Sequence, residues 1–178
     1  MEPAHVTPLP FSWARIERLH DSDPAIHWQR STAEGLECPF EVFRQVFSEE
    51  AINADFASVV RALDFGTVRW QLVEVSGIAL RQVRVDRLFQ HALDEARERC
   101  AQFGVRDDRE DVVLHWEEVG SWIVPPVMVT GEVLGTNFGY QLLVGFTRLG
   151  NLLGLLDREE IPEGTRHLVW VGSAVACA

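Results

Sequence analysis

The sequence predicts a mixed domain of helices and strands, an α/β protein of the α+β kind with a small mixed sheet, flanking helices and an N-terminal helical extension. Three patterns indicate it. Residues 68–72 alternate apolar and polar, as in a half-buried strand; residues 89–103 place apolar side chains at helical spacing; and residues 140–156 read as strand, glycine and helix. The expected division is 1–66 for the arm and extension and 67–178 for the sheet domain, packed as one compact unit.

Composition and charge limit the classes of function. The 178 residues are 47% hydrophobic and 24% charged, which suits one globular domain with a core. The 16 basic residues, all arginine, face 27 acidic ones, and the net charge of -11 excludes a generally basic nucleic-acid surface. The lack of lysine excludes Schiff-base chemistry and a Walker-type lysine. Residues 61–106 hold eight arginines against six acidic residues, so any DNA contact is expected there.

The first third of the chain is expected to be helical. Prolines within residues 3–10 suggest a poorly ordered arm, and the folded body is expected to start near Phe40. Apolar spacing predicts helices over 40–47 and 56–63. The strand at 68–72 follows, and Ser76 with Gly77 is expected to form a turn.

The rest of the chain supplies the sheet and its long helices. Residues 89–103 predict a helix stopped by Gly104, and strands are expected at 127–130, 140–144 and 168–171. The acidic run at 107–118 has two interpretations, a solvated connection or a source of metal ligands.

The three cysteines are widely spaced and form no CxxC motif. Cys38, Cys100 and Cys177 therefore indicate neither a zinc site nor a disulfide framework, and a cytoplasmic location is expected. Cys100 lies on the apolar face of its helix, where a core role is favoured over a reactive thiol. The apolar stretch 138–156 contains glycines and an arginine, so no membrane span is expected.

A candidate anion site follows the strand 140–144. Gly145 precedes an apolar helix, and Arg148 lies one turn inside it. A helix start offers free N–H groups and a positive dipole end, glycine permits close approach, and arginine can bind phosphate with two hydrogen bonds. The alternative is an ordinary turn glycine beside a surface arginine.

Two segments resemble the ParB family. Ile78-Ala79-Leu80-Arg81-Gln82-Val83-Arg84, followed by a helix ending at Gly104, is similar to its first motif. Pro125-Pro126-Val127-Met128-Val129 with Tyr140-Gln141-Leu142-Leu143-Val144-Gly145-Phe146-Thr147-Arg148-Leu149 is similar to its second. The resemblance covers about 68–172 and implies a ParB/sulfiredoxin-like fold; residues 1–66 have no counterpart.

The resemblance also implies a nucleotide site. Its residues would be Gln82 and Arg84 on one side of the bound phosphates and Gly145, Phe146, Thr147 and Arg148 on the other. Phe146 stands where a sulfiredoxin has its cysteine, so sulfinic-acid repair is not expected. The chain ends 30 residues after Arg148, so partition-type centromere binding is not expected either.

What remains resembles the single-domain plasmid proteins of this superfamily that inhibit fertility, the oncogenic-suppression type. The resemblance implies a block on DNA transfer by a conjugative or T-DNA secretion system, with ATPase and DNase activity that uses ATP and Mg²⁺. The expected catalytic residues are Arg148, Arg84 and Glu132, and the expected metal ligands are Glu132, Glu117 and Glu118. Non-specific DNA contact is expected from Arg69, Arg81, Arg84 and Arg87.

The alternative is a non-catalytic nucleotide-binding module. It would inhibit by docking on a secretion or coupling protein of a type IV system, through acidic N-terminal helices and exposed aromatic residues such as Trp13 and Trp28. Those two tryptophans equally fit a loosely ordered arm. Either function suits a cytoplasmic protein held at the inner membrane through a partner.

Overall fold

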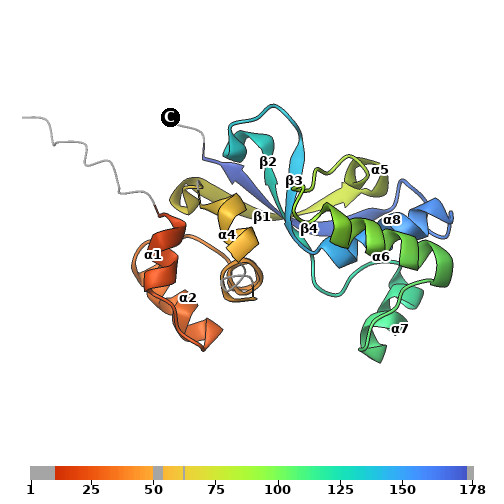
Figure 1. The fold of residues 1–178 in the computed structure, drawn as a ribbon, viewed down its shortest axis with the longest axis horizontal. Helices are drawn as coiled ribbons and strands as arrows, with labels where there is room; N and C mark the ends of the chain where they lie inside the picture. Colours follow the sequence, from red (N-terminus) through yellow and green to blue (C-terminus); the bar gives the residue numbers. More distant parts are fainter. Residues whose placement is uncertain (1–10, 50–53, 62, 176–178) are drawn as a thin grey trace, which may run out of the picture. The chain divides into compact units, whose positions relative to one another are not determined.

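The computed structural model of the chain describes residues 11–49, 54–61 and 63–175 (Figure 1). The chain divides into two compact units. The first comprises the residues up to Arg69 together with those from Val175, and the second comprises Trp70–Ala174. The described part is a mixed α+β protein, which confirms the predicted fold class.

The first unit is built from helices. They are α1 (Trp13–Arg18), α2 (Pro24–Ala33), α3 (Phe40–Phe43), the π-helical segment η1 (Arg44–Glu49), α4 (Ala54–Val60) and the 3-10 turn η2 (Phe65–Thr67). The Asp23 carboxylate accepts a 2.8 Å hydrogen bond from the Ala25 N–H, and Pro24 takes the first helical position, so α2 begins there. The helical extension predicted for this region is therefore confirmed, but it begins well before Phe40.

The core of this unit corrects two expectations about tryptophan. The Trp13 ring is 1% exposed and lies 5.8 Å from the rings of both Phe47 and Phe56. The Trp28 indole N–H donates to the Cys38 carbonyl at 2.8 Å. Trp13 is thus a core residue rather than an exposed docking aromatic or part of a loose arm, and Trp28 is half-buried and hydrogen-bonded. Residues 1–10, which hold the prolines of the expected arm, lie outside the described residues.

The sheet has the strand order β1-β4-β2-β3. Its strands are β1 (Val68–Ser76), β2 (Val127–Thr130), β3 (Tyr140–Val144) and β4 (Arg166–Ala174). β2 pairs antiparallel with β3, pairing Val127 with Val144 and Thr130 with Tyr140, and it pairs parallel with β4. The antiparallel pair is joined through the 3-10 turn η3 (Gly131–Leu134). All four predicted strands are present, and β4 is longer than the sequence suggested.

Four helices belong to the second unit: α5 (Gly77–Leu80), α6 (Gln90–Phe103), α7 (Glu110–Val119) and α8 (Phe146–Asp157). The helices predicted at 89–103 and after Gly145 are confirmed. Two local predictions were wrong. The expected turn at Ser76 and Gly77 is a short helix capped by the Ser76 hydroxyl, and the acidic run forms α7 in place of a solvated connection. Glu110 and Asp111 occupy the first turn of α7, where carboxylates stabilise a helix.

The helices α6 and α8 pack closely and run in the same direction. A Cβ at Gly150 would lie 2.7 Å from Ala96 Cβ, and a Cβ at Gly154 would lie 2.7 Å from Cys100 Cβ. The contact partner on α6 therefore moves from residue 96 to residue 100 as the glycine on α8 moves from 150 to 154. Partners that advance together in this way show that the two helices are parallel. Met128, Leu142 and Val169 of the sheet share one hydrophobic core with the buried faces of these helices. Within the described ranges, no helix has the length and apolar content that crossing a membrane requires.

Candidate anion site at the start of α8

The turn between β3 and α8 depends on glycine. Gly145 is buried, has φ +104° and stands at the N-cap of α8 without a side chain to cap the helix. A Cβ there would lie 2.7 Å from Pro126 Cβ and 3.2 Å from Arg148 Nε. A residue with a side chain would therefore be strained by its backbone angle and would clash with its neighbours. The predicted strand, glycine and helix turn is present.

Arg148 has a different role from the one expected. Its NH1 donates to the Val124 carbonyl at 2.7 Å, and its guanidinium lies against Gly145. This hydrogen bond joins the loop before β2 to the first turn of α8. In this arrangement Arg148 holds the shape of the turn, and the N–H groups of Phe146 and Thr147 are left as the donors that an anion would meet.

The starts of α6 and α8 lie together. The Phe89 ring, at the N-cap of α6, stacks on the Phe146 ring with centroids 4.7 Å apart and planes at 17°. Neither helix has a side-chain cap. Because the helices are parallel, their positive dipole ends are neighbours, and the two ends together attract negative charge more strongly than one would. The sequence interpretation missed this pair, although a phenylalanine at each helix start was a visible signal.

Gln82 and Arg84 are placed beside the other end of β3. The Arg84 N–H donates to the Tyr140 carbonyl at 2.9 Å, and the Arg84 carbonyl accepts from the Leu142 N–H at 2.8 Å. The Arg84 guanidinium lies over the Phe138 ring, 4.3 Å from its centroid. Arg84 forms a bridge to Gln141, and Gly145 follows four residues later, about 13 Å along the strand. Gln82 is exposed in the turn after α5. The structure therefore anchors Arg84 and Arg148 at opposite ends of β3.

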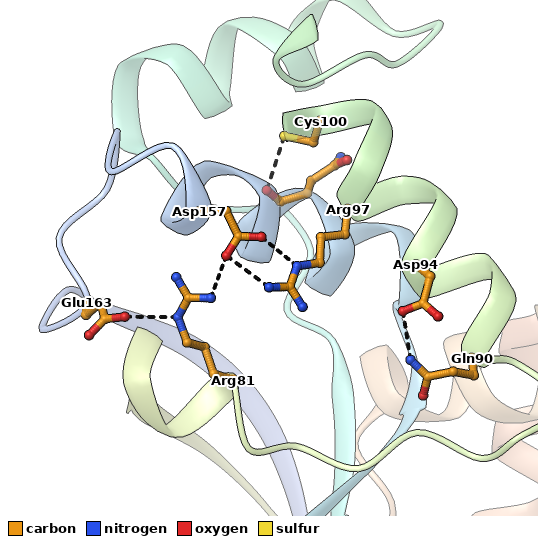
Figure 2. Close-up of polar contacts among 8 residues, drawn as sticks. Arg81, Gln90, Asp94, Arg97, Cys100, Asp157 and Glu163 are labelled. Carbon is orange, nitrogen blue, oxygen red and sulfur yellow. Dashed lines mark hydrogen bonds and ion pairs between the residues drawn. The ribbon is translucent and has the colours of Figure 1, made fainter. Parts of the chain in front are cut away.

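The arginines expected to contact DNA are differently engaged. Figure 2 shows Arg81 between two carboxylates, with NH1 at 2.7 Å from Asp157 and Nε at 3.0 Å from Glu163. Arg97 binds the same Asp157 at 2.6 Å. Hydrogen bonds from Arg97 and then Arg81 hold the pKa of Asp157 below its usual value. Arg81 is thus neutralised within the fold.

The other three lie in different places. Arg69 belongs to the first unit, and Arg84 lies on an aromatic ring beside the Tyr140 end of β3. Arg87 is exposed on the segment that leads to Phe89, at the start of α6.

The expected metal ligands are not gathered. Glu132 is exposed in η3, whereas Glu117 and Glu118 are exposed on α7. Across the described ranges, no three His, Cys, Asp or Glu side chains lie together in a way that could hold a metal ion. None of the three lies at the start of α8. Glu132 follows the Thr130 end of β2, opposite the end that pairs with Val144 beside Gly145, and Glu117 lies with Leu155 near the carboxyl end of α8.

The thiols are protected by burial. Cys38 and Cys100 are free and buried, and burial raises both thiol pKa values, that of Cys100 to about 11. A thiol with a raised pKa is protonated near neutral pH and is a poor nucleophile. Cys177 lies outside the described residues.

Comparison with protein families, with curated proteins and with solved structures finds no match for this chain. What the site can do therefore follows from its own geometry. That geometry comprises two parallel helix starts joined by a pair of stacked rings and a glycine turn held by Arg148. Such an arrangement can bind a phosphate group through main-chain N–H groups.

Proposed function

We propose that this protein binds a nucleotide through its phosphates at the start of α8 and acts as a plasmid fertility-inhibition protein, blocking DNA transfer by a conjugative or T-DNA secretion system. The observation that carries the binding step is the pair of parallel, uncapped helix starts joined by Phe89 and Phe146. The transfer block is supported by the resemblance to the ParB/sulfiredoxin superfamily and to its fertility-inhibition protein Osa.

The phosphates would meet the N–H groups of Phe146 and Thr147, where two dipoles favour negative charge. Arg148 would serve as a positioning residue, because its hydrogen bond to Val124 fixes the turn. Arg84 and Arg87 would contact a phosphate backbone, with modest and salt-sensitive affinity. In this proposal, nucleotide and DNA would both be bound by the second unit.

The catalytic form of this proposal is an ATPase and DNase that uses Mg²⁺. When bound, the metal would neutralise phosphate charge, but Glu132, Glu117 and Glu118, the carboxylates expected to hold it, lie on η3 and α7, away from the start of α8. The dispersal of these three side chains favours the second candidate, in which the nucleotide is bound without hydrolysis and inhibition comes from docking on a coupling protein. Such a protein would act in the cytoplasm, at the inner membrane through that partner.

Calorimetric titration with ATP and Mg²⁺ tests the binding step, using two variants of the exposed Thr147. Thr147→Asp places a carboxylate in the first turn of α8, which stabilises the helix but repels phosphate. We expect at least a tenfold weaker affinity with an equal or higher melting temperature. Thr147→Asn is the neutral, similarly sized control and should stay within about twofold of wild type. Unchanged affinity in Thr147→Asp would remove phosphate binding from this turn.

A second assay separates the two candidates. Single- and double-stranded DNA are incubated with the full chain, with and without Mg²⁺ and ATP, and products and phosphate release are measured. Metal-dependent turnover that Thr147→Asp abolishes supports the catalytic form. Tight ATP binding with no turnover supports the docking form, and activity equal in wild type and Thr147→Asp identifies a contaminant.

A further inference from the structure

A second site lies at the opposite end of α8. A pocket of about 330 Å³ is lined by residues of α7 and of the carboxyl ends of α6 and α8. We name it the α7 pocket; its apolar wall is formed by Phe103, Val113, Trp116, Leu155 and Ile161. The twelve residues of α8 place it about 18 Å from the anion site. Its volume is in the range of small-molecule sites.

Three helix carboxyl ends contribute to this pocket. Gly104 at the end of α6, Gly120 at the end of α7 and Leu155 in the last turn of α8 all line it. A helix carboxyl end carries about half a negative charge. The parallel packing that brings positive ends together at one side of α6 and α8 thus brings negative ends together at the other.

Two of the three charged side chains that line the pocket are acidic. Glu117 and Glu160 are acidic, and Arg106 is the one basic lining residue. Arg158 binds Glu160, with its Nε 2.6 Å from Oε1. Glu117 lines the pocket and is exposed, so its carboxylate can receive a cation from outside.

We infer that the α7 pocket binds an organic cation, a primary ammonium group on an apolar or aromatic body. The ammonium group would lie at Glu117 and the helix ends, and the body would pack on Trp116 and Ile161, with Phe103 able to add a cation–π contact at the mouth. The α6 and α8 pair would then bind an anion at its amino-terminal end and a cation at its carboxyl end. This inference does not depend on the nucleotide site.

Three probes of one shape test the sign of the ligand. Phenethylammonium, 2-phenylethanol and 3-phenylpropionate are each titrated into the full chain labelled with ¹⁵N, and amide and indole shifts are followed. We expect saturable shifts at Gly104, Gly120 and the Trp116 indole, with phenethylammonium bound tightest and 3-phenylpropionate weakest. Equal affinity for the alcohol, tighter binding of the carboxylate, or shifts elsewhere only would overturn the inference.

Charge variants provide the second arm. Glu117→Gln should weaken phenethylammonium binding about two- to fivefold, as expected of a partly exposed ion pair, and Arg106→Gln should strengthen it by a similar factor. Glu118→Gln makes the same charge change on α7 outside the pocket lining and should change affinity less than 1.5-fold. Equal effects of Glu117→Gln and Glu118→Gln would show a general charge effect and contradict a site at Glu117.

Discussion

Arg148 shows that one residue type at one position supports two chemistries. When an arginine follows a glycine by three residues at a helix start, its guanidinium can bind a phosphate or can hydrogen-bond a main-chain carbonyl. The 2.7 Å hydrogen bond to Val124 selects the second in this structure. The choice depends on where the loop before β2 runs, which the local sequence does not encode.

The separation of Arg84 from Arg148 changes an expectation about their coupling. A shared pocket predicts non-additive substitutions, but the strand between their anchoring points spans about 13 Å. We therefore expect the losses of ATP affinity in Arg84→Ala and Arg148→Ala to sum in the double variant to within about 0.5 kcal/mol, measured by calorimetry. Arg99→Ala on exposed α6 is the control for general charge loss. A coupling energy above about 1 kcal/mol would restore the shared pocket.

At the scale of elements, the α6 and α8 pair governs both candidate sites, and it depends on two glycines. A methyl group at Gly150 would lie 2.7 Å from Ala96 Cβ and from the Leu93 carbonyl oxygen. Because the second of these is main chain, the helices must separate. We expect Gly150→Ala to lower the free energy of unfolding by about 1–3 kcal/mol in chemical denaturation.

Gly164→Ala is the matched control, because a Cβ there meets nothing within 4 Å. It should leave stability unchanged or raise it by up to about 1 kcal/mol, since alanine restricts the unfolded chain. A Gly150→Ala variant as stable as Gly164→Ala would mean that the two helices are not in tight contact.

The ion pairs around Asp157 limit how many arginines of the second unit could contact a DNA phosphate backbone (Figure 2). Asp157 holds Arg81 and Arg97, so Asp157→Asn should release Arg97 for phosphate contact and leave Arg81 paired with Glu163 alone. We expect tighter single-stranded DNA binding by fluorescence anisotropy and a salt dependence steeper by roughly 0.7 in log–log slope for each added contact. Asp94→Asn, an exposed carboxylate on α6, controls for the change in net charge. Equal slopes in the two variants would place DNA elsewhere.

At the scale of the whole molecule, two buried histidines link stability to pH. Burial lowers the pKa of His27 and His167 from the usual 6.5. His167 Nδ1 lies 3.0 Å from the Ser121 hydroxyl, and His27 Nε2 lies 3.0 Å from the Ile16 carbonyl oxygen. The folded state therefore binds fewer protons than the unfolded state below pH 6.5, and protonation favours unfolding.

Their stabilisation is complete above pH 6.5 and is lost as pH falls from 6.5 through the lower folded-state pKa values. Each histidine can contribute a slope of up to about 1.4 kcal/mol per pH unit. His167→Gln should therefore reduce the slope of unfolding free energy between pH 6.5 and 5, measured in urea. The exposed His91→Gln should leave the slope unchanged. A wild-type stability that is flat over this range would contradict neutral, buried histidines.

The local patterns of the sequence determined the fold class, the four strands, the helices α6 and α8 and the glycine turn between β3 and α8. The strands and helices follow from the periodicity of their apolar residues, and the turn follows from a glycine in a backbone conformation that other residues rarely adopt. α7 and the first helices of the chain were not predicted, because charged residues and prolines in and around them masked their short apolar faces. Trp13 was assigned to an arm or a docking surface for the same reason, since proline and charge near it hid the spacing of Trp13 and Ile16.

Tertiary structure alone decided which side chains meet. Arg81 and Arg97 look basic in sequence, yet Asp157, 76 and 60 residues away, binds both. The parallel packing of α6 on α8 arises because Gly150 and Gly154 allow two main chains to approach, and that contact places one pair of helix starts and one set of helix ends at opposite sides. Sequence determined the elements, because their signals are local. Their pairing determined the sites, because helix dipoles and ion pairs act through space.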